Sequence, residues 1–282
     1  MPNAKNDTMP SHERILALGP PGAGKTFQIR SLPGRKFVYF FDPSGKRSII
    51  GADIDYEEFL PDVTETDWTL KGFNKGALSD KPKIKKEPSV YKRWEDDVNA
   101  RYDSGFFLNY DWVIIDSLTL LSRALMNRVL YLNGRYGDVE DLSDYRVVGN
   151  KLSDILVPLT SMPVSLYMTA HTVDRQNDLT KRITTEIDLP GAARAILPKL
   201  CSNIWELRST TDTQQKYTLL TRSEPRGYAG LRTTIQGLEP LIDITIKDRV
   251  RPELSGIGAV LTKAGFKPSP AAPAPAAVAV NS

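Results

Sequence analysis

The residues best suited to chemistry form one short glycine-rich segment near the start of the chain. Eight consecutive residues fit the pattern G-x-x-x-x-G-K-T: Gly19, Pro20, Pro21, Gly22, Ala23, Gly24, Lys25 and Thr26. In such a loop the backbone N–H groups converge on an anion, and glycines keep Cβ atoms out of its way. Lys25 can reach the outer phosphates of a nucleoside triphosphate, and the Thr26 hydroxyl can ligate Mg²⁺. The segment therefore predicts a binding site for ATP and Mg²⁺.

The loop can bind phosphate only if a strand leads into it and a helix follows it. The apolar run from Ile15 to Leu18 predicts a buried strand that ends at the loop. A helix is expected from Thr26 to Ser31, and Pro33-Gly34 would end it. The alternative is a chance match in an ordinary strand–turn–helix, which this context disfavours.

Other apolar runs predict the neighbours of that first strand. Strands are expected at 36–41, 112–115 and 164–170, and further, antiparallel strands at 203–207, 217–221 and 241–246. Helices are expected at 57–60, 90–102, 118–132, 145–159 and 192–200, and polar loops at 133–144 and 172–190. The first group of strands is continuously apolar, which is typical of parallel strands covered on both faces. We therefore expect an α/β fold with a mainly parallel sheet, flanking helices and antiparallel strands near the C-terminus.

The composition of the remaining segments predicts how the chain is divided. We expect a flexible N-terminus at 1–13 and an ATPase core at 14–250, with a polar, lysine-rich insertion at about 62–110. A short helical segment is expected at 251–266, followed by a disordered Pro/Ala tail at 267–282. The tail is too poor in large apolar side chains to fold alone.

Three polar residues at the ends of predicted strands are candidates for catalysis. Asp116 follows the strand at 112–115, where an acid can hold Mg²⁺ through water; a turn acid or helix N-cap is the alternative, and Ser117 could supply that cap instead. Asp42 and His171 each end another strand and could orient the attacking water or sense the γ-phosphate. Their plain alternatives are a turn-forming Asp before Pro43 and a hydrogen-bonded histidine.

The overall composition restricts the class of protein. A single cysteine, Cys201, excludes an internal disulfide framework, and two histidines, His12 and His171, argue against a histidine-based metal site. The formal net charge of +3 permits a nucleic-acid partner without arguing for one. No apolar run is long enough to cross a bilayer, and residues 1–11 lack the apolar core of a secretion signal. We therefore expect a cytoplasmic protein with no membrane partner.

The order of four motifs resembles a known family. The glycine loop, F-D-P at 41–43, V-I-I-D-S at 113–117 and T-A-H at 169–171 are together similar to RecA-like ATPases of tailed phages. Within that group the chain most resembles the single-strand annealing ATPases, which are often described simply as AAA-family ATP-binding proteins. The likeness extends from about Arg14 to Lys247.

This resemblance implies partners and an assembly. It implies single-stranded DNA as the ligand, a phage-infected bacterial cytoplasm as the location, and a ring or filament with nucleotide between neighbouring subunits; a single-strand-binding protein is a further candidate partner. His171 falls where the family places a γ-phosphate sensor, and Arg222 falls where a basic residue can reach the neighbour's nucleotide. The loops at 133–144 and 172–190 would line the DNA path, the second with Arg175, Lys181 and Arg182.

A second basic segment mixes cations with aromatic residues. Lys85 and Lys86 precede Tyr91 and Trp94, which could stack on an unpaired base. The alternative for this segment is a solvated surface, and for the basic loop a mobile polar loop.

One departure from the family pattern leaves the turnover rate open. RecA proteins carry a catalytic glutamate two residues after the aspartate that ends the second strand, whereas this chain has Ser44 after Asp42 and Pro43. Either Asp42 or another acid such as Glu57 substitutes, or hydrolysis is slow. The main rival function is a motor or loader ATPase that acts on a protein or on duplex DNA, and a slow nucleotide-switched regulator is a third. A small-molecule kinase is disfavoured because the sequence has no compact arginine-rich lid.

Overall fold

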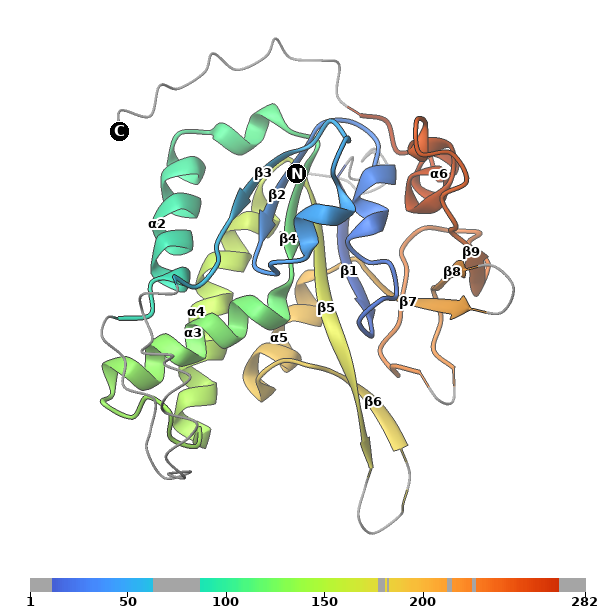
Figure 1. Cartoon of the computed structure of the whole chain (residues 1–282). Helices are drawn as coiled ribbons and strands as arrows, with labels where there is room; N and C mark the ends of the chain where they lie inside the picture. The colour runs from blue at the N-terminus through green and yellow to red at the C-terminus, as the bar shows by residue number, and fades with distance from the viewer. Residues whose placement is uncertain are drawn as a thin grey trace, which may run out of the picture.

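The strands assemble into one mainly parallel sheet with helices on its faces, the α/β fold expected from the sequence (Figure 1). The computed structural model describes residues 12–62, 87–176, 181, 183–211, 215–224 and 227–268. Within them the sheet order is β3-β2-β4-β5-β1-β7-β8-β9, and β6 pairs with β5 outside this path. Strands β3 through β7 in this order are mutually parallel, and β8 and β9 continue antiparallel. The mainly parallel sheet with C-terminal antiparallel strands is therefore confirmed.

The central strands are continuously apolar because helices and turns cover both of their faces. These strands are β1 (Arg14–Gly19), β2 (Lys36–Phe40), β4 (Trp112–Asp116), β5 (Ser165–Gln176) and β7 (Asn203–Thr211). Along β1, Leu16 and Leu18 point into one buried cluster, and Ile15 and Ala17 point into the other. This alternation places one apolar core on each side of the sheet.

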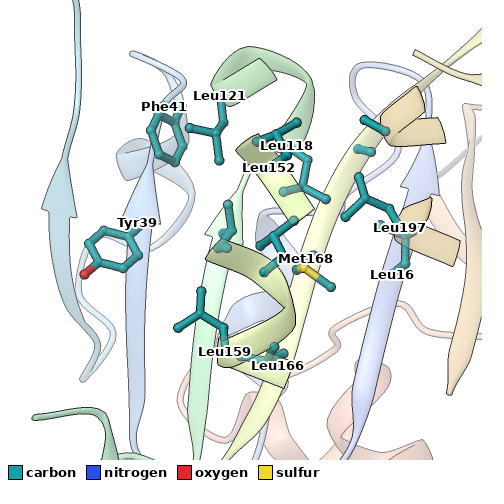
Figure 2. Close-up of a cluster of buried hydrophobic side chains, with 14 of the residues drawn as sticks. Leu16, Tyr39, Phe41, Leu118, Leu121, Leu152, Leu159, Leu166, Met168 and Leu197 are labelled. Carbon is teal, nitrogen blue, oxygen red and sulfur yellow. The ribbon is translucent and has the colours of Figure 1, made fainter. Parts of the chain in front are cut away.

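Four α-helices cover the first face of the sheet. They are α2 (Val90–Asp103), α3 (Leu118–Leu132), α4 (Leu142–Ser161) and α5 (Gly191–Leu200). Figure 2 shows Leu118 and Leu121 of α3, Leu152 and Leu159 of α4, and Leu197 of α5 packed over the strands. This layer fixes α3 directly behind Asp116, at the end of β4.

The second face is covered by shorter elements. They are η1 (Phe27–Ser31), η2 (Gly45–Ser48), η4 (Pro252–Leu254) and α6 (Gly256–Lys263), next to the edge strands β8 (Gln215–Leu220) and β9 (Leu241–Asp243). The helix expected after the glycine loop is only this one 3₁₀ turn, η1, before Pro33-Gly34. Helix α6 holds this turn in position. The N–H of Ile257 donates to Gln28 Oε1 (2.9 Å), and the N–H of Gly258 donates to Ser31 Oγ (3.1 Å). A Cβ on Gly258 would lie 1.7 Å from the Ser31 carbonyl oxygen, so only glycine allows this contact.

Two local predictions are wrong. Residues 57–60 were expected to form a helix, but Asp55–Glu58 forms the edge strand β3, because pairing with β2 satisfies its backbone. The polar loop expected at 172–190 is mostly a hairpin: β5 continues to Gln176 and pairs with β6 (Ile183–Ile187) beyond the edge of the main sheet (Figure 1). The polar sequence of this hairpin reflects its exposure rather than a lack of regular structure.

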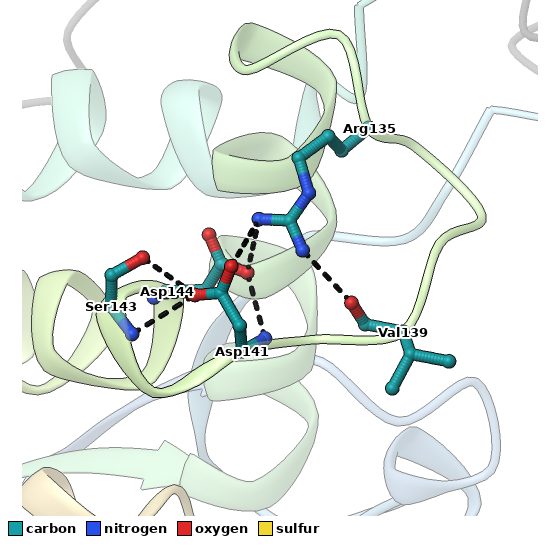
Figure 3. Close-up of polar contacts among 5 residues, drawn as sticks. All are labelled: Arg135, Val139, Asp141, Ser143 and Asp144. Carbon is teal, nitrogen blue, oxygen red and sulfur yellow. Dashed lines mark hydrogen bonds and ion pairs between the residues drawn. The ribbon is translucent and has the colours of Figure 1, made fainter.

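The loop expected at 133–144 ends three residues early because α4 begins with a strong cap. The Asp141 side chain accepts hydrogen bonds from the N–H groups of Ser143 and Asp144. The Asp144 side chain in turn accepts one from the N–H of Asp141, which completes a capping box. Arg135 then binds Asp141 at 2.8 Å and Asp144 at 2.9 Å, and donates to the carbonyl of Val139 (Figure 3). This loop is therefore folded onto its own arginine.

Several predicted segments lie outside the described residues. These are the N-terminus at 1–11, the lysine-rich stretch at 63–86 and the tail from 269. The proposed division into core, insertion and tail stays a prediction. In the part of the chain that the structure covers, no helix is both long and apolar enough to cross a membrane.

Candidate functional site

The glycine loop lies at the end of β1, between β5 and β7. Gly19 has φ +150°, and a Cβ on it would lie 2.4 Å from the carbonyl oxygen of Leu207 in β7. Gly22 and Gly24 have φ of +80° and +88°, values that L side chains rarely adopt. The glycines thus let the loop turn sharply against a neighbouring strand, and its shape suits an anion nest.

Lys25 lies over this loop. Its Nζ donates to the carbonyl oxygens of Gly19 (2.7 Å) and Pro20 (2.9 Å), and its backbone carbonyl accepts from the hydroxyl of Tyr167 (3.1 Å). Burial lowers the pKa of Lys25 to about 8, partly offset by the charges of Asp116 and Asp42. The ammonium is thus held by neutral oxygens, and a bound phosphate would provide a counter-charge.

Asp116 lies beside the loop and is almost fully buried. Its Oδ2 accepts from the Thr26 hydroxyl at 2.8 Å, and its Oδ1 accepts from the Thr169 hydroxyl at 2.5 Å. Burial raises the pKa of this carboxyl, while both hydroxyls and Lys25 act to lower it. The helix N-cap is Ser117, whose hydroxyl oxygen accepts from the N–H of Leu120 (3.5 Å), so Asp116 is not used as a cap.

The donor set around Asp116 fits Mg²⁺. A hydroxyl and a carboxylate oxygen are the hard ligands that this ion prefers. Gly45 of η2 faces the same carboxylate, and a Cβ there would lie 3.3 Å from Asp116 Oδ2 and 2.7 Å from the Phe40 ring. The glycine therefore keeps space beside the oxygen that a metal-bound water would need.

His171 connects the phosphate loop to the other side of β5. Its Nδ1 lies 3.3 Å from Lys25 Nζ, its N–H donates to the Thr119 hydroxyl (3.0 Å), and its carbonyl accepts from the N–H of Asp188 (2.8 Å). Burial lowers the pKa of His171, and the nearby Lys25 charge lowers it further. The ring is therefore neutral at pH 7 and can accept a hydrogen bond from Lys25.

Asp42 faces the same space from the end of β2. Its negative charge partly opposes the lowering of the pKa of Lys25 and of His171 by burial, and it adds to the raised pKa of Asp116. Its Oδ1 accepts from the N–H (2.8 Å) and the hydroxyl (2.7 Å) of Ser44, so the turn-forming role of Asp42 is present as well. Glu57, the other acid considered, instead pairs with Arg101 of α2 at 3.1 Å.

A cleft of about 800 Å³ opens on the far side of His171. It lies between α3, the start of α4 and the segment that joins β6 to α5, and Thr119 and Asp188 form part of its wall. Four arginines line it: Arg123, Arg146, Arg175 and Arg194. Arg175 and Arg194 share Glu186 as an ion-pair partner, whereas Arg123 and Arg146 are exposed and form no ion pair with any described residue.

Only some of the DNA-binding residues predicted from the sequence lie within the described part of the chain. Arg175 is 59% exposed and pairs with Glu186 at 3.2 Å, and Lys181 is exposed with φ +54°. Arg182, Lys85 and Lys86 lie outside the described residues. The acids that hold Arg135 make the 133–141 loop unsuitable as a phosphate contact by itself.

Arg222 does not join the nucleotide site of its own chain. It is exposed and follows β8, and it forms no hydrogen bond or ion pair with a described residue of the glycine loop. A role at the nucleotide of a neighbouring subunit stays a prediction.

Three residues of the site were missed by sequence reasoning. Thr169 and Tyr167 are polar residues inside an apolar strand, and that contrast was the available signal. Thr119 lies in the first turn of α3, where nothing in the local pattern marks it as a partner of His171.

Comparison with known proteins gives one family match. The family model described as an AAA domain matches residues 11–233. No curated protein matches the chain. Among solved structures, the flagellar accessory protein FlaH from Methanocaldococcus jannaschii is similar at 10% sequence identity and a TM-score of 0.37, over 88% of this chain and 89% of that one.

Proposed function

Because the chain belongs to the AAA domain family over residues 11–233, we propose that it is a Mg²⁺-dependent RecA-like ATPase that binds single-stranded DNA. We place its action in phage DNA recombination, annealing or replication, in the cytoplasm of an infected bacterium. The order of the motifs at 19–26, 41–43, 113–117 and 169–171 supports this assignment.

One observation carries the proposal: His171 connects the phosphate loop to Thr119 and Asp188, which line the arginine-rich cleft. The path runs from Lys25 Nζ to His171 Nδ1 (3.3 Å), and from the His171 N–H to the Thr119 hydroxyl (3.0 Å), which borders the cleft. A triphosphate that recruits Lys25 would withdraw it from His171. The backbone at the cleft wall would then respond to nucleotide, which is what a DNA-binding ATPase requires.

The residues of the loop divide the chemistry between them. The backbone N–H groups of residues 22–26, after the two prolines of the loop, and the Lys25 ammonium would bind the phosphates and stabilise the charge that develops on them. Thr26 and Asp116 would hold Mg²⁺, which would supply positive charge to neutralise the outer phosphates. Asp42 is the acid that remains to orient the attacking water, with its Oδ1 fixed by Ser44. Ser44 thus compensates in part for the missing glutamate, although turnover would be slow.

The cleft supplies what a single strand of DNA needs. Arg123 and Arg146 have no acidic partner among the described residues, so binding phosphates there would break no ion pair. Tyr145 also lines the cleft and offers a ring on which a base can stack. Arg175 and Lys181 extend this basic surface along the β5–β6 hairpin.

Assembly would complete the site. The chain would form a ring or filament in which Arg222 contributes to the nucleotide of a neighbour, because its side chain is exposed and free to reach another subunit. A single-strand-binding protein is a further expected partner.

A loader that acts on a protein partner is the second candidate. The observation in its favour is the apolar surface beside the cleft: Val139 is 84% exposed and Leu142 is 89% exposed. Such a surface is typical of contact with another protein.

The deciding experiment measures ATP hydrolysis by the purified chain alone, with single-stranded DNA and with duplex DNA, alongside Lys25→Ala. Stimulation by single strands that is absent in Lys25→Ala supports the proposal. ATP binding without stimulation by either DNA would reject the DNA-dependent function and favour the loader. Preference for duplex would indicate a duplex motor.

A further inference from the structure

Two aromatic rings and a free arginine lie beside the phosphate loop and are not used by the chemistry described above. Tyr217 of β8 packs against Gly24: a Cβ on that glycine would lie 2.7 Å from the ring. Phe27 follows Thr26 directly, and its ring centroid lies 6.4 Å from that of Tyr217, with the planes 35° apart. Both rings are only partly buried.

The position of these rings relative to the loop is fixed on both sides. The N–H of Tyr217 donates to the Thr245 hydroxyl (3.0 Å), and its carbonyl accepts from the N–H of Ile244 (2.9 Å). Phe27 begins η1, which Gln28 anchors by donating to the Ile244 carbonyl (2.8 Å). The same short segment after β9 thus holds both rings in register.

A guanidinium completes the cluster. The Cζ atoms of Arg249 and Arg30 each lie 5.8 Å from the Phe27 centroid. Arg30 is committed to the carbonyls of Ser48 and Ile50. Arg249 is exposed and forms no hydrogen bond or ion pair with any described residue, so its charge is available to a ligand.

We propose that Phe27, Tyr217 and Arg249 form the base-binding subsite of the nucleotide, and that this subsite binds the face of the base without reading its edge. The proposal rests on the proposed ATPase function. A nucleotide whose outer phosphates lie at Lys25 and Thr26 extends its ribose and base past Gly24 and Phe27, where the two rings lie. Stacking on aromatic rings, with a cation nearby, tolerates any base.

The carboxamide next to Phe27 in sequence is not free to recognise the edge of a base. Gln28 adjoins Phe27 in sequence, but its Nε2 donates to Ile244 and its Oε1 accepts from Ile257 and Ser31. It therefore has no free pair of donor and acceptor to present to a base. The site should accept GTP nearly as well as ATP, in contrast to sites that select adenine by paired hydrogen bonds.

The test compares nucleotides with inorganic tripolyphosphate, which occupies the phosphate loop but has no base. We would measure the Kd of ATP, GTP and tripolyphosphate in the presence of Mg²⁺ by calorimetry for the wild type, Tyr217→Ala, Tyr217→Phe and Arg249→Ala. Arg251→Ala is the matched control, because Arg251 is exposed two residues further on and pairs with Asp248.

We expect Tyr217→Ala to weaken ATP and GTP binding roughly tenfold and to leave tripolyphosphate binding unchanged, since one base stack is lost. Tyr217→Phe keeps the ring and should bind like the wild type. Arg249→Ala should weaken both nucleotides a few-fold, and Arg251→Ala should weaken neither.

Three results would overturn the inference. Tyr217→Ala could weaken ATP and tripolyphosphate equally, which would make the ring a support for Gly24 only. Tyr217→Ala could instead leave the Kd of both ATP and tripolyphosphate unchanged. Wild-type protein could bind ATP more than about a hundredfold tighter than GTP, which requires edge recognition. If the wild type binds no ATP, or if Lys25→Ala binds it equally well, the proposed ATPase function itself fails.

Discussion

The two halves of β5 behave as different kinds of structure. From Ser165 to Ala170 the strand is buried between β4 and β1, and the hydroxyls of Tyr167 and Thr169 are hydrogen-bonded within the site. From Thr172 to Gln176 it leaves the main sheet, pairs with β6 and becomes exposed towards its end (Figure 1). The buried half is fixed before any ligand arrives, whereas the projecting half can adapt to one. His171 is the residue at which one behaviour changes to the other.

The largest difference in ATP hydrolysis should come from Asp→Asn substitutions made on either side of His171. Asp116→Asn, beside the buried half, should reduce Mg²⁺-dependent ATP hydrolysis by about 100-fold or more, because an oxygen that can hold the metal becomes an amide. The comparison is Asp174→Asn in the projecting half, where Asp174 accepts from the Thr185 hydroxyl at 2.8 Å. Steady-state hydrolysis without DNA should be unchanged in that variant. Equal loss in both would show that the hairpin belongs to the phosphate site.

The exposed region should dominate DNA binding instead. The double variant Arg123→Ala/Arg146→Ala should weaken binding of a fluorescent single strand by about 10- to 100-fold and reduce the slope of log K against log salt by about 1.4. Basal hydrolysis should be unaffected. The control removes two exposed cations elsewhere, Lys92→Ala/Lys263→Ala. If this control weakens DNA binding as much as the cleft variant does, the protein attracts DNA through its overall charge, and the cleft is not the DNA-binding site.

Buried and exposed threonines should differ in what they contribute to stability. Thr169→Val removes the 2.5 Å hydrogen bond to buried Asp116 and should lower the free energy of unfolding by about 1–3 kcal/mol. Thr184→Val removes an exposed 3.4 Å contact to the Arg175 carbonyl and should change it by less than about 0.5 kcal/mol. Urea denaturation measures both. A larger effect at Thr184 would contradict the division of β5.

The smallest effect on basal ATP hydrolysis is expected at His171, where the two halves of β5 meet. His171→Gln keeps a hydrogen-bonding side chain but changes its reach, so basal hydrolysis should fall only about threefold, or roughly 0.6 kcal/mol. Stimulation by single strands should fall more than the basal rate. Thr119→Val, which removes the acceptor of the His171 N–H, should reduce stimulation in the same way. Full stimulation in both variants would disconnect the cleft from the nucleotide.

The parts that the sequence predicted well are those where one local pattern suffices. The glycine loop, the buried strand that ends at Asp116 and the helix from Leu118 to Leu132 each follow from spacing and apolar character. Residues 55–58 became a strand only because β2 offered an edge to pair with, which no local pattern contains. The polar residues 172–176 extend β5 for the same reason.

The contacts of the candidate site were harder to predict because they join distant segments. Thr169 to Asp116 and His171 to Thr119 each span about fifty residues, and nothing in either short segment indicates the other. Arg123 and Arg146 became a pair only when α3 and α4 were placed on one face of the sheet. Such residues need the topology before their chemistry can be inferred.

The contact of α6 with η1 also has a consequence for the order in which the protein matures. The glycine loop is synthesised before α6, but the turn behind it rests on Ile257 and Gly258 of α6. A nascent chain that has released all the parallel strands still lacks this support. Its phosphate loop is then attached to an unanchored single turn. Nucleotide is therefore expected to bind only after α6 has left the ribosome, although the glycine loop itself was synthesised earlier.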